Sequence, residues 1–311
     1  MDFRQLKTFL TVVDTGNITR AAEILHLVQP AVSRQIKLLE EDLGTPLFER
    51  QRHGMVPTEA GRMLVDYARR SMLELDRARA EIVGAKNGIG GIVTLGLLPS
   101  TIDVLSGPLL SSIAAKYPGI RLRLAMGYAG TLAKWLESGE IDAALLYGAE
   151  HLPNIDIKPL VEEPLWVVWP KSYKLKAGKT VSLKEFAKHP VILPSTSHGI
   201  RALMDHACAV ADIQLEIAAE ANALSVQRSL VINGHGLSIL PPLAVTEDLK
   251  SKQLGGAPLS SPSISRTIVL ATPNNRPSGQ HVQCAVDLLT ECVKESVVTG
   301  KWLEGKWLIS N

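Results

Sequence analysis

The chain has 311 residues, and its 33 Lys and Arg residues against 31 Asp and Glu residues give a formal net charge of +2 at pH 7. This length suits two or three domains whose cores need no disulfide or metal, and the balanced charge excludes a protein that binds nucleic acid by bulk positive charge alone. The three cysteines, Cys208, Cys284 and Cys292, form no CxxC pair, so we expect neither a disulfide framework nor a zinc site. Charges near the first residue and the absence of a long apolar run lead us to expect a cytoplasmic protein that is neither secreted nor inserted in a membrane.

The first predicted element is a helix from Asp2 to Asp14. One of its faces is apolar at helical spacing, with Phe3, Leu6, Phe9, Leu10 and Val13. We expect this face to pack behind the next two helices and to complete a three-helix core.

Residues 17–44 are expected to form two short helices joined by a tight turn, a helix-turn-helix. Asn17 is suited to cap the first helix, because its side-chain oxygen accepts from a free backbone N–H. The second helix begins near Gln29 and Pro30, where the missing proline donor does no harm, and Gly44 ends it. The residues of the second helix expected to face inward are Ala31, Val32, Ile36, Leu39 and Leu43.

The outward face of this second helix carries Gln29, Ser33, Arg34 and Lys37. Arg forms bidentate hydrogen bonds with guanine and Gln with adenine, and the N-terminal end of such a helix enters the major groove of double-stranded DNA. Residues 1–90 hold 13 Lys and Arg residues against 12 Asp and Glu residues, so any DNA contact must come from local arrangement. The alternative is a solvated helical hairpin.

The segment from Glu49 to Pro57 has two short extended pieces around Gly54, which fits a wing. Basic side chains there would lie near the DNA backbone, where contacts position a protein without specifying a sequence. The predicted DNA-binding residues are Gln29, Pro30, Ser33, Arg34, Lys37, Arg50, Arg52 and His53.

An ordered series of residues from Met1 to about Gly61 carries a family resemblance. The series comprises Phe3-Arg4-Gln5-Leu6, Phe9, Ala21-Ala22, Gln29-Pro30-Ala31-Val32-Ser33-Arg34-Gln35-Ile36, Leu39-Glu40, Leu43-Gly44, Leu47-Phe48, Arg50 and Thr58-Glu59-Ala60-Gly61. It resembles the winged helix-turn-helix of the LysR-type transcriptional regulators. One departure is Val28, which stands where the family usually has a Ser or Thr that caps the reading helix and can touch phosphate.

A proline-free segment from Thr58 to about Lys86 predicts a long helix. Small and apolar residues recur in it at alternating spacings of four and three, namely Leu64, Ala68, Ser71, Leu75, Ala78, Ile82 and Ala85. This spacing, between flanks dense in charge, predicts a seam along which two copies of the helix pair. A helix packed on the core of its own domain is the alternative. In the family that the chain resembles this is the dimerising linker helix, and Asn87 to Gly91 would then be a hinge.

From Ile92 onward, strand-like and helix-like segments alternate, which favours an open α/β sheet of mostly parallel strands. Strands are expected at residues 93–97, 121–126, 143–146, 165–169, 191–193, 216–219, 237–240 and 267–271, and helices at about 104–116, 131–138, 183–189, 200–211, 224–233 and 281–298. We expect the chain to cross between two halves near residues 161–164 and again near 263–268. Two α/β lobes around a cleft would result.

This half resembles the periplasmic-binding-protein-like effector domain of the same family, through Leu132, Leu136, Gly139 and Ile141-Asp142. The expected fold is therefore α+β and multidomain, with a winged helix-turn-helix at 1–58, a linker helix and hinge at 59–90, and a two-lobed α/β domain at 91–300. Lobe 1 is expected at about 91–161 and 268–300, and lobe 2 at about 162–267. The tail at 301–311, with Trp302 and Trp307, fits an added strand, a packing tail or an interaction segment.

Two loops are candidates for an effector site, because ligands of open α/β folds bind where strand ends meet helix starts. Hydroxyls, free N–H groups, an imidazole and a guanidinium in such loops suit an anion such as a carboxylate, and plain helix capping is the alternative. The candidates are Ser100 and Thr101 from one lobe and Ser195, Thr196, His198 and Arg201 from the other, with Gly130, Thr131, Asn222 and Ser225 as lesser ones. The run from His198 to Arg201 is loosely similar to the branch of the family that contains the nitrogen assimilation control protein.

The expected function is a sequence-specific DNA-binding transcriptional regulator, activator or repressor, that responds to a small organic anion. A LysR-type regulator without a ligand, controlled by its own level, is the alternative. We expect no catalytic residue, metal or cofactor, because the eight histidines lack metal spacing and no catalytic motif occurs. If the chain were a solute-binding protein or a structural DNA-bending protein, much of it would have no function. Expected partners are double-stranded DNA, the effector and further copies of the chain in a homodimer or homotetramer, with RNA polymerase as another candidate.

Overall fold

The computed structural model describes residues 1–51, 54–84, 88–148, 152–175, 179–196 and 198–309. The chain forms two compact units, one of Met1–Ile92 with Ser138–Glu140 and one of Val93–Glu137 with Ile141–Asn311. Within the part of the chain that the structure describes, no helix combines the length and apolar character needed to cross a membrane.

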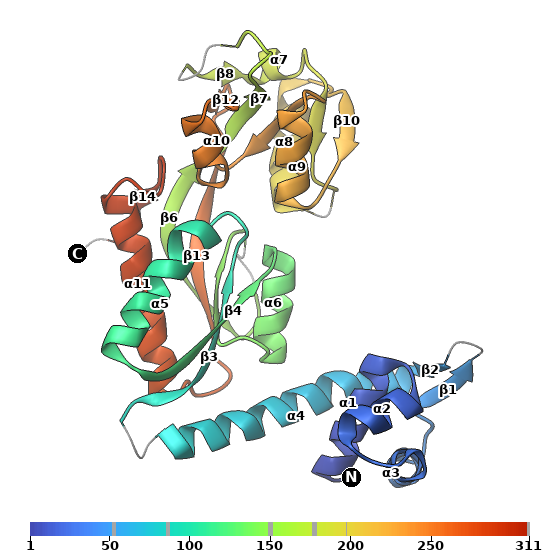
Figure 1. Cartoon of the computed structure of the whole chain (residues 1–311). Helices are drawn as coiled ribbons and strands as arrows, with labels where there is room; N and C mark the ends of the chain where they lie inside the picture. The colour runs from blue at the N-terminus through green and yellow to red at the C-terminus, as the bar shows by residue number, and fades with distance from the viewer. Residues whose placement is uncertain (52–53, 85–87, 149–151, 176–178, 197, 310–311) are drawn as a thin grey trace. The chain divides into compact units, whose positions relative to one another are not determined.

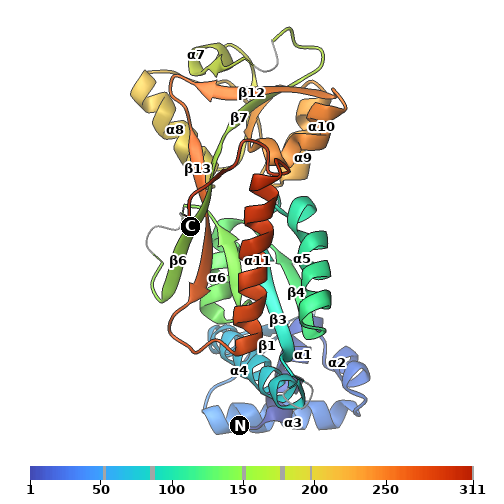
Figure 2. The same ribbon diagram turned by 90° about the vertical axis from the view of Figure 1, so that its left-hand side faces the viewer.

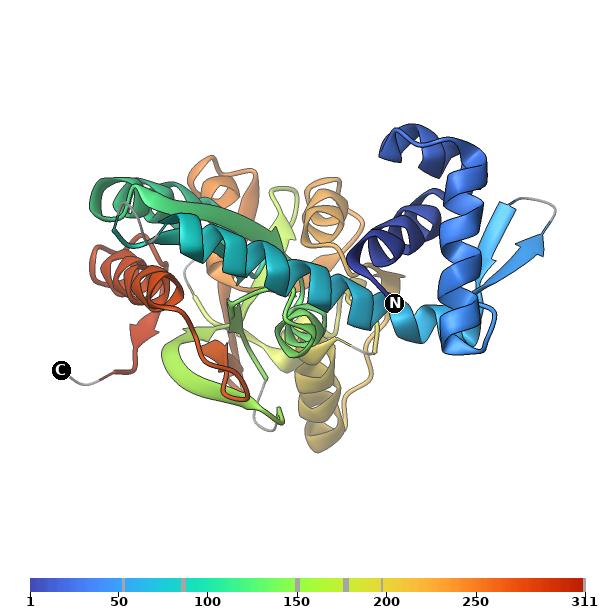
Figure 3. The ribbon, with the colours of Figure 1, turned by 90° about the horizontal axis from the view of Figure 1, so that it is seen from below.

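The N-terminal unit is a helical domain with a two-stranded wing, followed by a long helix (Figure 3). Its elements are α1 Phe3–Thr15, α2 Ile18–Leu25, α3 Gln29–Leu43, β1 Phe48–Gln51, β2 Gly54–Pro57 and α4 Glu59–Gly84. The predicted cap at Asn17 is confirmed, since its Oδ1 accepts from the backbone N–H of Thr19 at 2.8 Å and of Arg20 at 3.1 Å. Helix α3 ends at Gly44, whose φ of 69° lies in the left-handed region that glycine adopts without strain.

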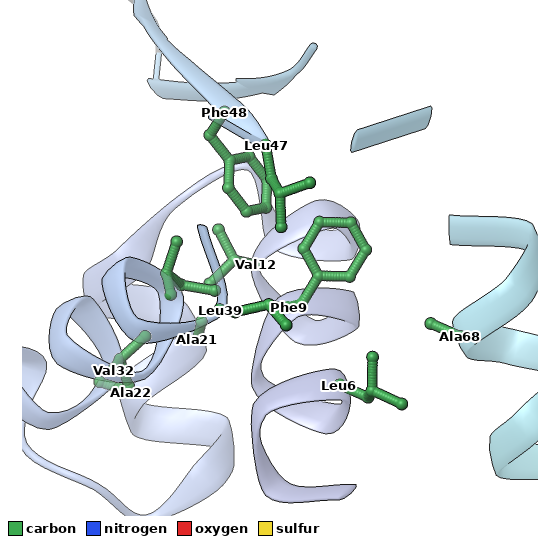
Figure 4. Packing of buried hydrophobic residues seen from close by; sticks show 11 residues of the cluster. Leu6, Phe9, Val12, Ala21, Ala22, Val32, Leu39, Leu47, Phe48 and Ala68 are labelled. Atoms are coloured by element: carbon green, nitrogen blue, oxygen red, sulfur yellow. The ribbon is translucent and has the colours of Figure 1, made fainter. Parts of the chain in front are cut away.

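Helices α1, α2 and α3 pack around one hydrophobic core (Figure 4). Phe9 of α1 is fully buried, and its ring lies 5.3 Å from that of Phe48 at the start of the wing. Ala68 of α4 belongs to the same cluster, so the first turns of the long helix rest on this domain. The expectation that Leu43 faces inward is wrong, because it lies on the last turn of α3, beyond the helices that cover the core, and is 40% exposed.

The wing is an antiparallel hairpin in which Arg50 pairs with Met55. Gly54 begins its second strand with a φ of 129°, and a Cβ there would come within 2.2 Å of the carbonyl oxygen of Gly16. The adjacent Met55 N–H donates to that same oxygen at 2.7 Å. A glycine is therefore required where the wing touches the end of α1.

The described part of the C-terminal unit contains two six-stranded sheets, one in each lobe (Figure 1). The first has the order β14-β6-β13-β5-β3-β4, with β3 Gly90–Leu97, β4 Gly119–Met126, β5 Ala143–Leu146, β6 Ile155–Pro164, β13 Ser265–Pro273 and β14 Lys306–Trp307. The second has the order β10-β9-β11-β7-β12-β8, with β7 Trp166–Pro170, β8 Val181–Ser182, β9 Val191–Leu193, β10 Ile217–Glu220, β11 Leu237–Leu240 and β12 Leu254–Ser260.

Helices cover both sheets, and α5 and α11 lie side by side on the first (Figure 2). The helices are α5 Ile102–Lys116, α6 Ala129–Ser138, α7 Leu183–Phe186, α8 Gly199–Ala211, α9 Leu224–Ile232, the 3₁₀ helix η2 Pro242–Val245, α10 Thr246–Lys250 and α11 Gln280–Val298. Because helices and neighbouring strands enclose it, all four residues of β5 are buried.

The chain crosses between the lobes twice, through segments that lie side by side. Strand β6 continues into β7 across Leu165, whose N–H donates to the carbonyl of Ile264 at 2.8 Å on the returning segment between β12 and β13. Strands β6 and β13 pair antiparallel along most of their length. The expectation of mostly parallel strands is wrong, because these crossing strands insert antiparallel pairings into both sheets.

The C-terminal tail adds a strand and a buried tryptophan to the crossing strands. Strand β14 pairs antiparallel with β6, with Trp307 opposite Val161. Trp302 is 1% exposed, and its indole Nε1 donates to Glu163 Oε2 at 2.7 Å. Of the three interpretations open for the tail, an added strand and a packing tail therefore both describe it.

Candidate functional site

The outer face of α3 presents the polar residues predicted to contact DNA. Gln29, Pro30, Arg34 and Lys37 are exposed, and Ser33 is partly exposed. Gln29 Nε2 donates to Ser33 Oγ at 3.3 Å, which orders two of these side chains, and Lys37 Nζ lies 3.6 Å from Glu41. Among the described residues Arg34 has no carboxylate partner, so its guanidinium stays available to a base or phosphate.

Val28 precedes this helix as its N-cap residue, and it has no side-chain oxygen to accept a hydrogen bond. The departure noted in the sequence therefore leaves the first free N–H groups of α3 without a side-chain cap. Arg50 on β1 is exposed. Arg52 and His53 lie outside the described residues, so their predicted roles stay predictions.

The long helix α4 changes environment along its length. Ala60, Leu64, Val65, Ala68 and Met72 pack on the core of the N-terminal unit, so the predicted seam is wrong for Leu64 and Ala68. Further along, Leu75 is 48% exposed and Ile82 is 69% exposed. Leu75 and Ile82 on the second half of α4 thus leave much of their apolar surface exposed.

The cleft between the two lobes of the C-terminal unit forms where three helices begin. Ser100 precedes α5, Ile200 lies in the first turn of α8, and Leu224 opens α9. The lining consists of Leu98, Pro99, Ser100, Tyr128, Tyr147, Pro194, His198, Ile200, Asn222, Leu224, Gln227, Ile239, Leu240, Pro241 and Arg266. Helix N-termini carry partial positive charge and unpaired N–H groups, so their convergence favours a negative group in the cleft.

Arg266 supplies the guanidinium of the cleft. It is 7% exposed, and its Nε donates to Glu163 Oε1 at 2.7 Å while Nη2 donates to Ser100 Oγ at 2.8 Å. Its guanidinium carbon lies 4.7 Å from the centre of the Tyr147 ring. Since Trp302 donates to the other oxygen of the fully buried Glu163, both carboxylate oxygens are satisfied and Arg266 is held in one position.

His198 is a neutral hydrogen-bonding group in this setting. Burial, together with the nearby Arg266 guanidinium, lowers its pKa below the ordinary value. Its Nδ1 accepts from the backbone N–H of Ile200 at 3.3 Å, so Nε2 carries the proton of the neutral ring and donates to the hydroxyl of Tyr147, also at 3.3 Å. Burial raises the pKa of Tyr147, which keeps its hydroxyl protonated.

Within the described ranges, two hydrogen bonds join the lobes across the cleft. One is the contact between His198 and Tyr147, and the other runs from the N–H of Leu224 to the hydroxyl of Tyr128 at 2.9 Å. The space that remains is about 30 Å³, room for roughly two water molecules. In this arrangement the cleft therefore has less room than a ligand of metabolite size needs.

The structure brings some predicted effector residues to the cleft and leaves others outside its lining. Ser100 and His198 line the cleft, and Ser195 lies behind Asn222, to whose Oδ1 it donates through both N–H and Oγ at 2.9 Å. Gly130, Thr131 and Thr196 are exposed outside the lining. Thr101 is fully buried and its hydroxyl donates to the carbonyl of Leu98 at 3.0 Å, so the expectation that it faces the cleft is wrong.

Arg201 also lies outside the cleft lining. Its Nε pairs with Asp205 at 2.8 Å and its Nη1 with Glu220 at 2.7 Å, and Nη1 also donates to the carbonyl of Pro194. These hydrogen bonds raise the pKa of the guanidinium and fix it on the flank of α8. Arg201 is therefore not the cation of the cleft lining, which instead contains Arg266.

Sequence reasoning missed Arg266, Tyr128 and Tyr147. Tyr147 directly follows a predicted buried strand, at the end where ligands bind, so its position was a usable signal. Arg266 lies within the second predicted crossing, and an arginine on a segment that joins two lobes was a signal of the same kind. Among the described residues, no cluster of three or more His, Cys, Asp or Glu side chains is placed to hold a metal ion.

Comparisons with known proteins agree with this two-part arrangement. The family described as "Bacterial regulatory helix-turn-helix protein, lysR family" matches residues 3–62, and "LysR substrate binding domain" matches residues 86–293. The nitrogen assimilation regulatory protein nac of Escherichia coli (strain K12) is 27% identical over 299 residues, covering 96% of this chain and 97% of that protein. The HTH-type transcriptional regulator YybE of Bacillus subtilis (strain 168) is 30% identical over 271 residues, 87% of this chain and 92% of that protein. The crystal structure of full-length CbnR complexed with its target DNA has a TM-score of 0.75 at 24% identity, covering 95% of this chain and 100% of that chain.

Proposed function

The chain belongs to the LysR family of bacterial regulatory helix-turn-helix proteins, and we propose from this that its inter-lobe cleft binds a small organic anion that alters how the protein holds DNA. It is a LysR-type DNA-binding transcriptional regulator with an effector-binding domain, and its family consists of regulators and not of enzymes. The family models end at residue 62 and begin at residue 86, and α4 occupies that interval. This supports a linker helix between a DNA-binding domain and an effector domain.

The observation that carries the proposal is Arg266 at the convergence of three helix N-termini. The guanidinium is buried, and Glu163 and Ser100 hold it in place. Its third nitrogen, Nη1, is the one through which we expect a ligand carboxylate to bind. Neutral donors around it, from Tyr147 and His198, add hydrogen bonds without adding charge, which suits a single carboxylate better than a polyphosphate.

Effector binding has to act through a difference between two lobe arrangements. Because the closed cleft has little free space, a ligand selects an arrangement in which the two cross-lobe hydrogen bonds are broken or remade around it. Coupling between two sites is typically about 1–3 kcal/mol, enough to change DNA affinity 5- to 150-fold.

For the DNA side, we propose that the chain binds an interrupted inverted repeat as a homodimer or homotetramer. The exposed apolar residues on the second half of α4 support this, because a helix pair would cover them and present two reading helices with two-fold symmetry. The DNA contacts would come from Gln29, Pro30, Ser33, Arg34, Lys37 and Arg50. A cytoplasmic location follows from that role, and RNA polymerase is a further candidate partner.

The test measures thermal unfolding of the full chain with a panel of small carboxylates, and DNA binding by gel shift with and without each stabilising compound. An effector at 100 times its Kd should add about 2.7 kcal/mol of stability. Ser100→Ala should weaken this response while leaving unliganded DNA binding unchanged, since Ser100 lies in the other unit from α3. Thr196→Ala is the matched control, because Thr196 is exposed outside the lining and should respond as the parent does.

Three observations favour the alternative of a regulator without a ligand. Arg201 is ion-paired, the Arg266–Glu163 pair is neutral as a unit, and the cleft is narrow. If the regulator binds no ligand, no carboxylate raises its unfolding temperature. Ser100→Ala then changes neither the response of thermal unfolding to carboxylates nor DNA binding. Replacing Glu163 and Arg266 together by Gln, which removes both charges at once, would then leave regulation intact.

A further inference from the structure

A second hollow lies on the C-terminal unit, away from the inter-lobe cleft. It is bounded by β7, β12, α10 and the segment that follows α11, and its volume is about 840 Å³. We call it the lysine groove, after Lys171, Lys250, Lys252 and Lys301 on its rim. Its described lining residues are all different from those of the cleft. Small-molecule sites typically span about 300–1,000 Å³, so the groove is of ligand size.

The indole of Trp166 is the aromatic surface that the groove offers, since Trp166 is partly exposed. Trp169 pairs with Gly255, where a Cβ would come within 2.2 Å of Trp169 Nε1, but Trp169 is only 2% exposed and its ring is covered. A Cβ on Gly256 would come within 3.0 Å of the Trp166 ring. Gly256 therefore lets the partly exposed indole of Trp166 pack closely on β12, which holds its ring in place in advance of any ligand.

The indole N–H of Trp166 is buried and has no acceptor among the described residues. Unsatisfied buried donors are rare in native proteins, and they commonly mark a place where a water or ion completes the hydrogen bond.

The rim of the groove is positive. Lys250 pairs with Glu247 at 2.9 Å, whereas Lys171, Lys252 and Lys301 have no carboxylate within ion-pair distance among the described residues. The described lining contains no Asp or Glu side chain. Three ammonium groups without a described carboxylate partner, beside the uncharged indole of Trp166, favour a ligand that is flat and negatively charged.

We propose that the lysine groove is a second ligand site of this regulator, which binds a planar aromatic anion. The ring of the ligand lies against Trp166, and its carboxylate or sulfonate group is held by Lys171, Lys252 and Lys301. This site is independent of the cleft, so it exists whether or not the cleft binds an effector.

Lysines on the exposed side of a strand have another role, which is to prevent edge-to-edge pairing of sheets. Strand β12 pairs with the short β8 at Leu259 and Ser260, near its end, so its first residues form such an edge. If this were the purpose of the lysines, their removal would cause self-association and would leave aromatic anions unaffected.

The probe for the test is 8-anilinonaphthalene-1-sulfonate, an aromatic sulfonate whose fluorescence rises in an apolar site. The full chain should bind it saturably, with energy transfer from tryptophan, and 1-naphthoate should compete. Replacing Lys171 by Gln, Lys252 by Asn and Lys301 by Gln should raise the Kd about tenfold or more. Each tenfold corresponds to about 1.4 kcal/mol of binding free energy. Asn is chosen at Lys252 because the φ of 58° there is left-handed, a conformation that Asn tolerates.

The matched control replaces three exposed lysines of the same unit, Lys134, Lys158 and Lys184, by Gln, which changes the net charge equally. It should bind the probe as the parent does. Circular dichroism and the unfolding midpoint establish that both variants are folded, and the single change Lys252→Asn gives the same reading should the triple variant fail to fold. The proposal is overturned if the parent shows no saturable binding, if both triple variants lose it equally, or if the groove variant keeps the parent's Kd and self-associates.

Discussion

Arg34, which has no carboxylate partner among the described residues, lies at the end of α3 that is expected to enter the major groove. Changing Arg34 to Ala should cost roughly 1–3 kcal/mol of DNA affinity and relax the preference at one base pair, because a bidentate contact to guanine is lost. Lys37→Ala is the comparison, since an ammonium on phosphate should weaken all sequences equally. Gel shifts over a panel of operator variants measure both. If Arg34→Ala loses the same affinity for every operator variant, Arg34 contacts phosphate and not a base.

His198 should make the stability of the C-terminal unit depend on pH. Its folded-state pKa is lowered by burial and by Arg266, so below the ordinary value of about 6.5 the unfolded chain binds more protons than the folded one. The contribution of His198 to the free energy of unfolding should therefore be at its maximum above pH 6.5. It should decrease as the pH drops from there through the lowered pKa. Denaturant unfolding between pH 7.5 and pH 5 checks this.

His198→Asn is the matched variant for that experiment, because Asn also accepts from the backbone N–H groups at a helix start and so preserves the cap of α8. Its loss of stability over the same pH range should be smaller than that of the parent. An identical slope in both proteins would assign the pH dependence to other groups.

Two arginines illustrate how far a site can be predicted residue by residue. Asp205 lies four residues after Arg201 on the same helix, so their ion pair was foreseeable from the spacing. The second partner of Arg201, Glu220, belongs to another element. Arg266 is 103 residues from Glu163 and 166 from Ser100 along the chain. Local sequence patterns carry no information on such contacts, because they depend on how two crossing strands align.

At the scale of elements, a buried side-chain hydrogen bond from Trp302 to Glu163 anchors the tail, in addition to the pairing of β14 with β6. Changing Trp302 to Phe keeps an aromatic ring but removes the donor to Glu163, which leaves one oxygen of a fully buried carboxylate unsatisfied. This should lower the free energy of unfolding by about 1–3 kcal/mol. Urea unfolding of the full chain measures it. Trp307→Phe, on a partly exposed strand, is the control and should cost less; an equal loss would show that packing, and not the hydrogen bond, matters at Trp302.

Elements with strong local signals were predicted and those without were missed. Asn17 and Gly44 mark the ends of α2 and α3 through their own side-chain or backbone chemistry, and β5 is a short run of apolar residues. Strand β6 was missed because it contains Pro159 and several charged residues, and it is stabilised by pairing with β13 rather than by its own pattern. The two-residue strand β14 has no pattern to detect, and it forms because Trp302 anchors the tail beside β6.

At the scale of the whole molecule, the second half of α4 should join two copies of the chain. Changing Leu75 to Asp puts a charge where a partner helix would bury an apolar side chain worth about 1.5–3 kcal/mol. The variant should be monomeric at micromolar concentration by sedimentation, and it should lose affinity for an inverted repeat. Val298→Asp, at an apolar residue that is 73% exposed on α11, is the control and should leave association unchanged. A Leu75 variant that still dimerises would place the contact elsewhere.

The paired crossing strands β6 and β13 also decide how the protein could evolve. The residues that touch a ligand determine which compound binds. By contrast, β14 and Trp302 support the crossing strands from a distance. Apparent affinity depends on the fraction of molecules already in the binding arrangement. Substitutions in β14, which is not part of the cleft lining, would therefore shift the concentration at which the regulator responds and leave its choice of compound unchanged, so that sensitivity and selectivity are adjusted by separate parts of the chain.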